Sequence, residues 1–292
     1  MRVLLCFDGS PAAVQAVHLV VARGWPAGST FKIFSVLPGP GGEDFQQQAL
    51  EPLVRRFGPQ SVLCEERTAG NVGETIVHVA AQWQADLIAM GTRERVGLTK
   101  LILGSISDYV LKHAHCSVLI ARATNHSFFL PGAADSAAYP PKILLCVDHY
   151  QDCLAAVSYL LSTSWPKDTH FVVLKVMEHH LKDFSIKVVL PWVNPPYEGD
   201  LEENAAIVDA ANVVGHVSDV LEERFGHCQI TELIQEGIAS FRILSVAKDN
   251  DIDLIVMGAR GAGAASARHH IGSVACRIAE EAPCSVQIVR TA

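Results

Sequence analysis

The chain has 292 residues, of which 49% are hydrophobic and 18% are charged. This composition is typical of a compact globular protein and excludes an intrinsically disordered chain. The formal net charge of -8 argues against a nucleic-acid partner, because contacts with many phosphates need a basic stripe.

Short apolar or β-branched runs alternate with longer helical segments along the first part of the chain. The runs predict strands at residues 3–7, 31–36, 61–68, 86–90 and 117–121. Helical spacing predicts helices over Ala12–Arg23, Val72–Gln84 and Ile106–His113. Ser10 suits the N-cap of the first helix, and Pro11 suits its first position. Strands that alternate with helices in this way indicate a parallel sheet with crossover helices.

The chain then repeats itself. Three pairs of segments match. Residues 2–8 (RVLLCFD) match 142–148 (KILLCVD), and residues 85–91 (ADLIAMG) match 252–258 (IDLIVMG). Residues 104–122 match 272–290, since both begin with Gly-Ser, contain Cys-Ser-Val and end with Arg. A repeat of this length predicts two homologous domains, each large enough to bury its own core.

We predict a first domain at residues 1–122, a linker at 123–141 and a second domain at 142–292. The linker is rich in Ala, Pro, Gly and Ser and matches neither half. The offset between equivalent residues grows from 140 (Asp8 to Asp148) to 167 (Ala85 to Ile252). The second domain therefore holds an insertion, which we place at about 179–204, before a long helix at about 201–225.

Candidate binding residues lie where strands of such a sheet end. Asp8 and Asp148 follow the first strand of each half, and Gly91 and Gly258 end the fourth. A Gly-Ser pair then begins a helix in each half, and a helix start presents free N–H groups and partial positive charge. In an open parallel sheet, ligands bind at the carboxyl ends of the strands. The pattern therefore favours an anion such as a nucleotide polyphosphate, although each glycine could instead serve a turn or tight packing.

The sequence resembles a tandem universal stress protein over nearly all of both halves, apart from the linker and the insertion. That family has an ADLIVMG-like strand followed by a phosphate loop with the spacing Gly, two residues, Gly, nine residues, Gly, then Ser or Thr. The resemblance implies two doubly wound, five-stranded parallel sheets with helices on both faces, a Rossmann-like fold of the adenine-nucleotide α-hydrolase-like type. In the first half it implies a nucleotide site at Asp8, Pro11, Val36, Gly91, Arg93, Gly104, Ser105 and Ser107. In the second half it implies a nucleotide site at Asp148, Val176, Gly258, Arg260, Gly261, Gly272 and Ser273.

Each half departs from this pattern at a different point. In the first half, Glu94 stands where the family has glycine, and a carboxylate beside a triphosphate is repulsive, although Arg93 and Arg95 flank it. In the second half, ten residues separate Gly261 from Gly272. Because an extra loop residue can bulge outward, the sequence slightly favours the phosphate end of the second half.

We expect a protein that binds ATP, or AMP or ADP, in stress response or signalling, with Mg²⁺ accompanying a triphosphate. We assign no catalytic residue, because no nucleophile elbow, P-loop lysine or general base is present, and expect at most slow hydrolysis. The alternative is an interaction module that has lost nucleotide binding and works through protein contacts. Glu94 and the longer second loop favour that alternative.

The last strands of the two halves lack edge protection, and unprotected edges usually find a partner. The resemblance implies that these strands pair across a dimer axis, so we expect the two halves to form an internal pseudo-dimer, and a second copy of the chain is the other candidate partner. No histidine or cysteine spacing indicates a metal site. A strand that begins at Arg2 leaves no room for a signal peptide, and the apolar runs are too short to span a bilayer, so we expect a cytoplasmic location without membrane contact.

Overall fold

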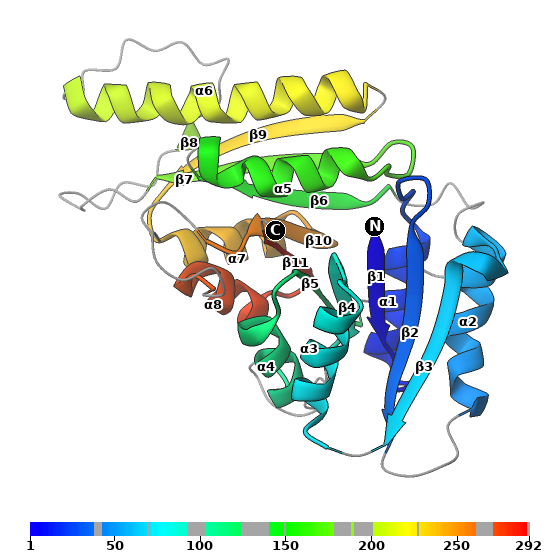
Figure 1. The fold of residues 1–292 in the computed structure, drawn as a ribbon. Helices are drawn as coiled ribbons and strands as arrows, with labels where there is room; N and C mark the ends of the chain where they lie inside the picture. The colour runs from blue at the N-terminus through cyan, green and yellow to red at the C-terminus, as the bar shows by residue number, and fades with distance from the viewer. Residues whose placement is uncertain are drawn as a thin grey trace.

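The computed structural model describes residues 1–37, 43–68, 70–92, 103–123, 140–148, 150–177, 188–189, 201–226, 228–260 and 271–290 (Figure 1). The elements of the first half are β1 (Arg2–Cys6), α1 (Pro11–Val21), β2 (Thr30–Leu37), α2 (Glu43–Phe57), the 3-10 turn η1 (Pro59–Ser61), β3 (Val62–Thr68), α3 (Val72–Gln82), β4 (Leu87–Gly91), α4 (Ser105–His113) and β5 (Ser117–Ala121). The elements of the second half are β6 (Lys142–Val147), α5 (Tyr150–Ser162), β7 (His170–Met177), β8 (Val188–Val189), α6 (Leu201–Arg224), β9 (Gln229–Glu236), α7 (Ala239–Asp249), β10 (Leu254–Gly258), α8 (Ser273–Glu281) and β11 (Ser285–Val289).

The two halves have the same strand order. It runs β3-β2-β1-β4-β5 in the first half and β9-β7-β6-β10-β11 in the second, with parallel pairing throughout each set. The winding direction therefore reverses between β1 and β4, and again between β6 and β10. The predicted α/β fold class is confirmed, and the reversal points lie beside the strand-end residues that the sequence singled out.

The two sets of strands join edge to edge. β5 pairs antiparallel with β11, with Leu119 opposite Gln287, so that the described strands form one 11-stranded sheet. Figure 1 shows the twist of this sheet, in which β6, β7 and β9 run across the direction of β1, β2 and β3. β8, inside the expected insertion, adds a short antiparallel strand beside β9.

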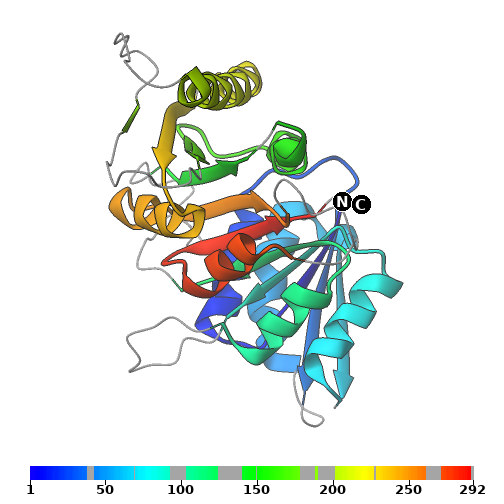
Figure 2. The same cartoon turned by 90° about the vertical axis from the view of Figure 1, so that its left-hand side faces the viewer.

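Helices cover both faces of the sheet, and alternation along each strand fills both layers. In β1, Val3 and Leu5 pack into the core under α1, α2, α5 and α6, whereas Leu4 packs into the core under α3, α4, α7 and α8. Figure 2 shows α7 and α8 on the near side, with α3 and α4 below them. Each core contains residues from both halves, so the halves share their apolar packing as well as their sheet.

Equivalent residues from the two halves meet around the β5–β11 joint. The Arg122 guanidinium donates to the backbone oxygen of Ala279 at 2.7 Å, and its counterpart Arg290 donates to the backbone oxygen of Leu111 at 2.7 Å. Each arginine thus binds the C-terminal turn of α8 or α4 in the other half, where helix carbonyls lack partners. The guanidinium of Arg23, which follows α1, is also buried, and it contacts Tyr159 of α5. It donates to Gln287 Oε1 at 2.7 Å and lies 4.7 Å from the centre of the Trp165 ring.

The sequence prediction missed one α-helix and one strand. α2 (Glu43–Phe57) was not predicted, and its sequence carries Pro52 among many charged and amide side chains. β8 falls in a stretch for which only an irregular excursion was expected. The predicted helix boundaries differ from the observed ones by one or two residues, as helix ends commonly do. The linker prediction at 123–141 and most of the insertion lie outside the described residues.

Candidate functional site

The end of β1 is shaped by a tight turn into α1. Gly9 has φ of 75°, a conformation that favours glycine. The Asp8 carboxylate accepts a hydrogen bond from the Ser10 N–H at 3.1 Å, and Ser10 Oγ accepts one from the Ala13 N–H at 3.2 Å. Pro11 occupies the first position of α1. The turn thus holds the exposed Asp8 side chain at the carboxyl edge of the sheet.

Gly91 lies directly against the start of α1. A Cβ atom built on Gly91 would overlap the backbone of Ala12 and Ala13, so only glycine fits there without movement. The Ser107 hydroxyl donates to the Gly91 carbonyl at 3.3 Å, and the Gly104 N–H donates to Thr92 Oγ1 at 3.4 Å. These bonds set α4 beside the end of β4.

The first turn of α4 faces this edge without a capping side chain. Gly104 is its N-cap, makes no side-chain cap hydrogen bond, and is followed by the exposed Ser105. Ser107 is 3% exposed, so in this structure its hydroxyl ties the helix to the strand. β2 lies beside β1 and carries Val36 near Asp8. The strand-end site of the first half therefore comprises Asp8, Val36, Gly91, Gly104 and Ser105.

The second half repeats the glycine and helix arrangement. The Gly272 N–H donates to the Ala259 carbonyl at 2.7 Å, and α8 begins at the exposed Ser273 without a side-chain cap. Ala275, the counterpart of Ser107, is 2% exposed. The strand-end site of the second half therefore comprises Asp148, Val176, Gly258, Gly272 and Ser273, with Arg260 following β10.

One difference separates the two strand ends. In the second half, Lys175 Nζ donates to Asp148 Oδ1 at 2.9 Å, and the two side chains are 7% and 47% exposed. In the first half the equivalent position holds Ser35, whose hydroxyl donates to the Phe7 carbonyl at 2.7 Å. A buried lysine beside the strand-end carboxylate was not predicted. The signal was visible as a single charge inside the apolar strand HFVVLKVM.

The structure brings together most of the predicted site residues at these two edges. Asp8, Pro11, Val36, Gly91, Gly104 and Ser105 share one edge, and Asp148, Val176, Gly258, Arg260, Gly272 and Ser273 share the other. Arg93, Gly261 and Glu94 lie outside the described residues. Chemically, each edge offers a carboxylate acceptor at one end and exposed helix N–H donors at the other.

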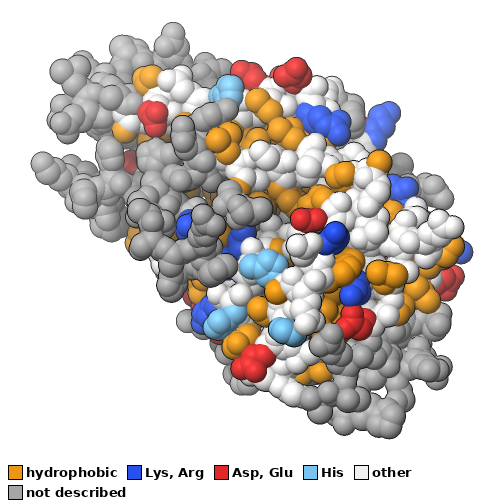
Figure 3. Space-filling view, in the orientation of Figure 1, with side chains coloured by type: hydrophobic (Ala, Val, Ile, Leu, Met, Phe, Trp, Pro, Cys, Tyr) orange, Lys and Arg blue, Asp and Glu red, His pale blue; other side chains and the backbone are white. Residues whose placement is uncertain are grey.

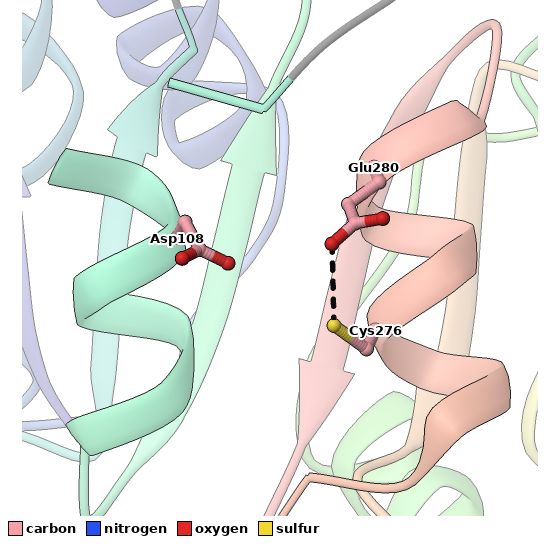
Figure 4. A group of neighbouring side chains, drawn as sticks. All are labelled: Asp108, Cys276 and Glu280. Carbon is pink, nitrogen blue, oxygen red and sulfur yellow. Dashed lines mark hydrogen bonds between the residues drawn. The ribbon is translucent and has the colours of Figure 1, made fainter. Parts of the chain in front are cut away.

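A second polar cluster lies where α4 meets α8 (Figure 4). Asp108, Cys276 and Glu280 bring three potential metal-ligand atoms within 4.8 Å of one another, and Cys276 Sγ donates to Glu280 Oε1 at 3.4 Å. The ammonium of Lys112 lies 2.8 Å from Asp108 Oδ1 and balances one of the two carboxylates. The hydrogen bond to Asp108 is the main cause that raises the pKa of Lys112, and the charges of Cys276 and Glu280 add to it. The charge of Glu280 on α8 thus favours the charged form of Lys112 on α4, an electrostatic link between the two halves.

The cysteine thiols of the sheet are protected by burial. Burial raises the pKa of the Cys116 thiol to about 12 and that of the Cys284 thiol to about 12. Burial also raises the pKa of the Cys6 and Cys146 thiols. None of the eight cysteines, all of which the structure describes, forms a disulfide, and Cys64 is exposed.

On the face shown in Figure 3, lysine and arginine side chains are scattered among acidic and apolar ones. No helix in the described parts of the chain is both long and apolar enough to cross a membrane.

Two doubly wound α/β halves, each with an aspartate and a helix start at its reversal point, define a tandem protein of the doubly wound α/β class. The model of the universal stress protein family matches residues 1–122 and 141–290. The chain therefore belongs to the universal stress protein family.

Relatives extend over one half or over both. A universal stress protein of Mycolicibacterium smegmatis is 22% identical over 282 residues, which cover 96% of this chain and 87% of that protein. Universal stress protein Sll1388 of Synechocystis is 28% identical over 149 residues, which cover 41% of this chain and 97% of that protein. The fold of a universal stress protein from Archaeoglobus fulgidus matches with a TM-score of 0.57 at 16% identity, and covers 99% of this chain and 98% of that one.

Proposed function

We propose that this protein binds an adenine nucleotide at the carboxyl edge of its sheet and uses that binding in stress response or signalling. The observation that carries the proposal is the pairing, in both halves, of a strand-end aspartate with an uncapped helix start. The aspartate would accept hydrogen bonds from the base or ribose, with the backbone of Val36 or Val176 alongside. The helix start would donate N–H groups to phosphates.

The phosphate end would use the residues around each Gly-Ser pair. In the first half these are Gly91, Gly104, Ser105 and Ser107, and we propose Arg93 as a further donor. In the second half they are Gly258, Gly261, Gly272 and Ser273, with Arg260 as a cationic donor. ATP, AMP and ADP all fit this chemistry, and Mg²⁺ would accompany a triphosphate.

We propose binding without rapid hydrolysis. In the proposed arrangement the carboxylates of Asp8 and Asp148 would bind the adenosine, and the helix starts would bind the phosphates. Hydrolysis needs a group that activates water within hydrogen-bond reach of the reacting phosphorus, and the described residues at the helix starts contribute donors. Bound nucleotide would then act by stabilising one conformation, and the two halves would work as an intramolecular pseudo-dimer through β5 and β11.

The experiment is thermal unfolding of the purified protein with and without millimolar ATP. A ligand that binds only the folded chain stabilises it by about 1.4 kcal/mol for each tenfold excess over its dissociation constant. We expect the melting temperature to rise with ATP and to rise less in Asp8→Asn. Denaturation of the purified protein should also release any adenine nucleotide carried through purification. No shift and no released nucleotide would sink the proposal.

A second candidate is an interaction module that acts through protein contacts. Ile238 and Phe241 favour it, because each is 62% exposed at the start of α7, where the first half has Asn71 and Glu74. Exposed apolar side chains beside one another often mark a binding surface. Nucleotide-independent partner binding that is lost in Phe241→Glu would support this candidate.

A further inference from the structure

We propose that the joint between the two halves binds a small monovalent anion, such as chloride, held by the buried guanidinium of Arg23 and the indole N–H of Trp165. Arg23 follows the end of α1, and Trp165 follows the end of α5. Both residues precede the strand that comes next in the chain, whereas the strand-end sites lie where strands finish. The anion site is therefore separate from those sites and does not depend on nucleotide binding.

The segments that follow α1 and α5 are held against each other. The Gly24 N–H donates to the Ser164 carbonyl at 2.8 Å, and the Ser164 N–H donates to the Gly24 carbonyl at 2.8 Å. The guanidinium carbon of Arg23 lies 4.7 Å from the centre of the Trp165 ring and 5.9 Å from the centre of the Trp25 ring. The joint thus places one guanidinium against the equivalent tryptophans of both halves.

The charge of this guanidinium has no counter-charge in the described parts of the chain. Arg23 is 0% exposed, and its Nη1 donates to Gln287 Oε1 at 2.7 Å and to the Tyr159 hydroxyl at 3.4 Å. Burial is the main cause that raises the pKa of the Tyr159 hydroxyl, which therefore stays neutral at pH 7. The charge of Asp86 also raises that pKa, but the Asp86 carboxylate accepts from the Arg2 N–H and forms no ion pair with Arg23. A buried cation without a counter-charge is strongly destabilising, and a guanidinium does not deprotonate in proteins.

The unpartnered polar atoms around the joint are all hydrogen-bond donors. Arg23 Nε and Nη2, Trp165 Nε1 and Gln287 Nε2 have no hydrogen-bond partner, and the three side chains are 0%, 7% and 0% exposed. A water molecule could accept from two of these groups, but its own two hydrogens would then need acceptors. An anion only accepts, and it also supplies the missing negative charge. Donors together with an unbalanced cation therefore fit an anion better than a water.

The comparison between the two tryptophans supports a role for the Trp165 N–H. Trp25 Nε1 donates to a carbonyl oxygen of its own helix, α1, at 2.8 Å. The equivalent carbonyl of α5, that of Leu160, accepts from the Thr163 hydroxyl at 3.1 Å. Thr163 is the counterpart of Arg23 in the second half. One position thus supplies the cation in the first half, and in the second half it leaves the Trp165 N–H for a partner outside its helix.

The solution test is thermal unfolding of the full-length protein at pH 7 in sodium chloride and in sodium gluconate of equal ionic strength. Chloride in about tenfold excess over its dissociation constant should raise the melting temperature by about 2–4 °C, with a saturable dependence on concentration. Arg23→Met removes the charge at similar side-chain length and should abolish the chloride-specific shift. Trp165→Phe should weaken chloride binding about tenfold, since it removes one hydrogen bond to a charged acceptor. Trp25→Phe is the matched control and should keep the affinity, because its N–H is already bonded within α1.

Crystals of the unmodified protein in bromide locate the ion. We expect an anomalous peak within hydrogen-bond distance of the Arg23 guanidinium and Trp165 Nε1. Density there without anomalous signal would indicate a water and overturn the proposal. A bromide peak without chloride-specific stabilisation in solution would indicate an adventitious ion only, and an equal chloride shift in Arg23→Met would indicate binding elsewhere; either result overturns the proposal. If Arg23→Met does not fold, the two tryptophan variants and the bromide peak decide.

Discussion

Replacing Asp148 by asparagine is expected to destabilise the fold far more than the equivalent change at Asp8. The substitution keeps the size of the side chain but removes the charge opposite the buried ammonium of Lys175. In the first half, Asp8→Asn leaves an amide oxygen that can still accept from the Ser10 N–H. The two variants therefore differ mainly in whether a buried cation loses its counter-charge.

The geometry sets the size of the effect. Two unit charges 2.9 Å apart interact by about 1.4 kcal/mol at the dielectric constant of water and about 6 kcal/mol at an effective value of 20. Asp148 is 47% exposed, so water screens the pair, whereas Lys175 is 7% exposed and depends on it. Removing one partner of a fully buried pair costs about 3–5 kcal/mol. We expect about 2–4 kcal/mol for Asp148→Asn and less than about 1 kcal/mol for Asp8→Asn.

Urea unfolding at pH 7, followed by circular dichroism, measures both variants. We expect a lower midpoint for Asp148→Asn at an unchanged slope, which indicates a change of stability and not of unfolding mechanism. The double variant Asp148→Asn with Lys175→Ser should recover at least about 1.5 kcal/mol relative to the sum of the single changes, because it removes the uncompensated charge. Equal losses at Asp8 and Asp148, or additive losses in the double variant, would refute the reasoning.

Three further outcomes follow from the packing. Gly91→Ala should lower the free energy of unfolding in urea by about 2–3 kcal/mol, because the added Cβ atom meets the backbone of α1. Gly272→Ala should lower it by about 1 kcal/mol or less, because the nearest atom to the added Cβ lies 3.4 Å away. Equal losses in the two variants would contradict the steric argument. Arg290→Ala should lower the free energy of unfolding by about 1.5–3 kcal/mol, because it removes the 2.7 Å hydrogen bond to the Leu111 carbonyl of α4. Arg290→Lys should recover part of this loss. An unchanged urea midpoint in Arg290→Ala would count against the contact. A thiol reagent at pH 8 should modify the exposed Cys64 at least a hundredfold faster than the buried Cys116, because burial raises the pKa of the Cys116 thiol to about 12. Comparable rates of modification would show that the sheet opens readily.

The sequence alone was enough to predict the architecture, because the signals for it are local and repeated. Residues 87–90 and 254–257 are continuous apolar runs that end at Gly91 and Gly258, as expected of strands buried on both faces. The turn from Asp8 into α1 could be predicted because Ser10 and Pro11 are typical of a helix start. α2 was missed because its sequence carries few apolar residues and a proline, and its packing on β2 and β3 is a tertiary effect.

The candidate site was predictable only in part. The residues that end strands could be listed from the repeat, but the partner of Asp148 could not, because Lys175 lies 27 residues away and reaches it only through the pairing of β6 with β7. The role of Ser107 depends in the same way on where its hydroxyl points. Side-chain direction at a strand end depends on register and on the adjoining turn, and neither is encoded in residue spacing.

The joint between the halves explains why a fused pair can differ from two identical copies. A residue on a true two-fold axis meets its own copy, so a charge there faces a like charge. In this chain Lys112 and Glu280 are equivalent positions of α4 and α8, and the cluster with Asp108 places opposite charges there. Arg23 likewise is buried against Gln287, a residue whose counterpart in the first half is Leu119. Such complementary pairs stabilise the association of the first half with the second over that of either half with itself. Once the association no longer requires identical partners, the strand ends are also free to diverge, as the contrast between Ser35 and Lys175 illustrates.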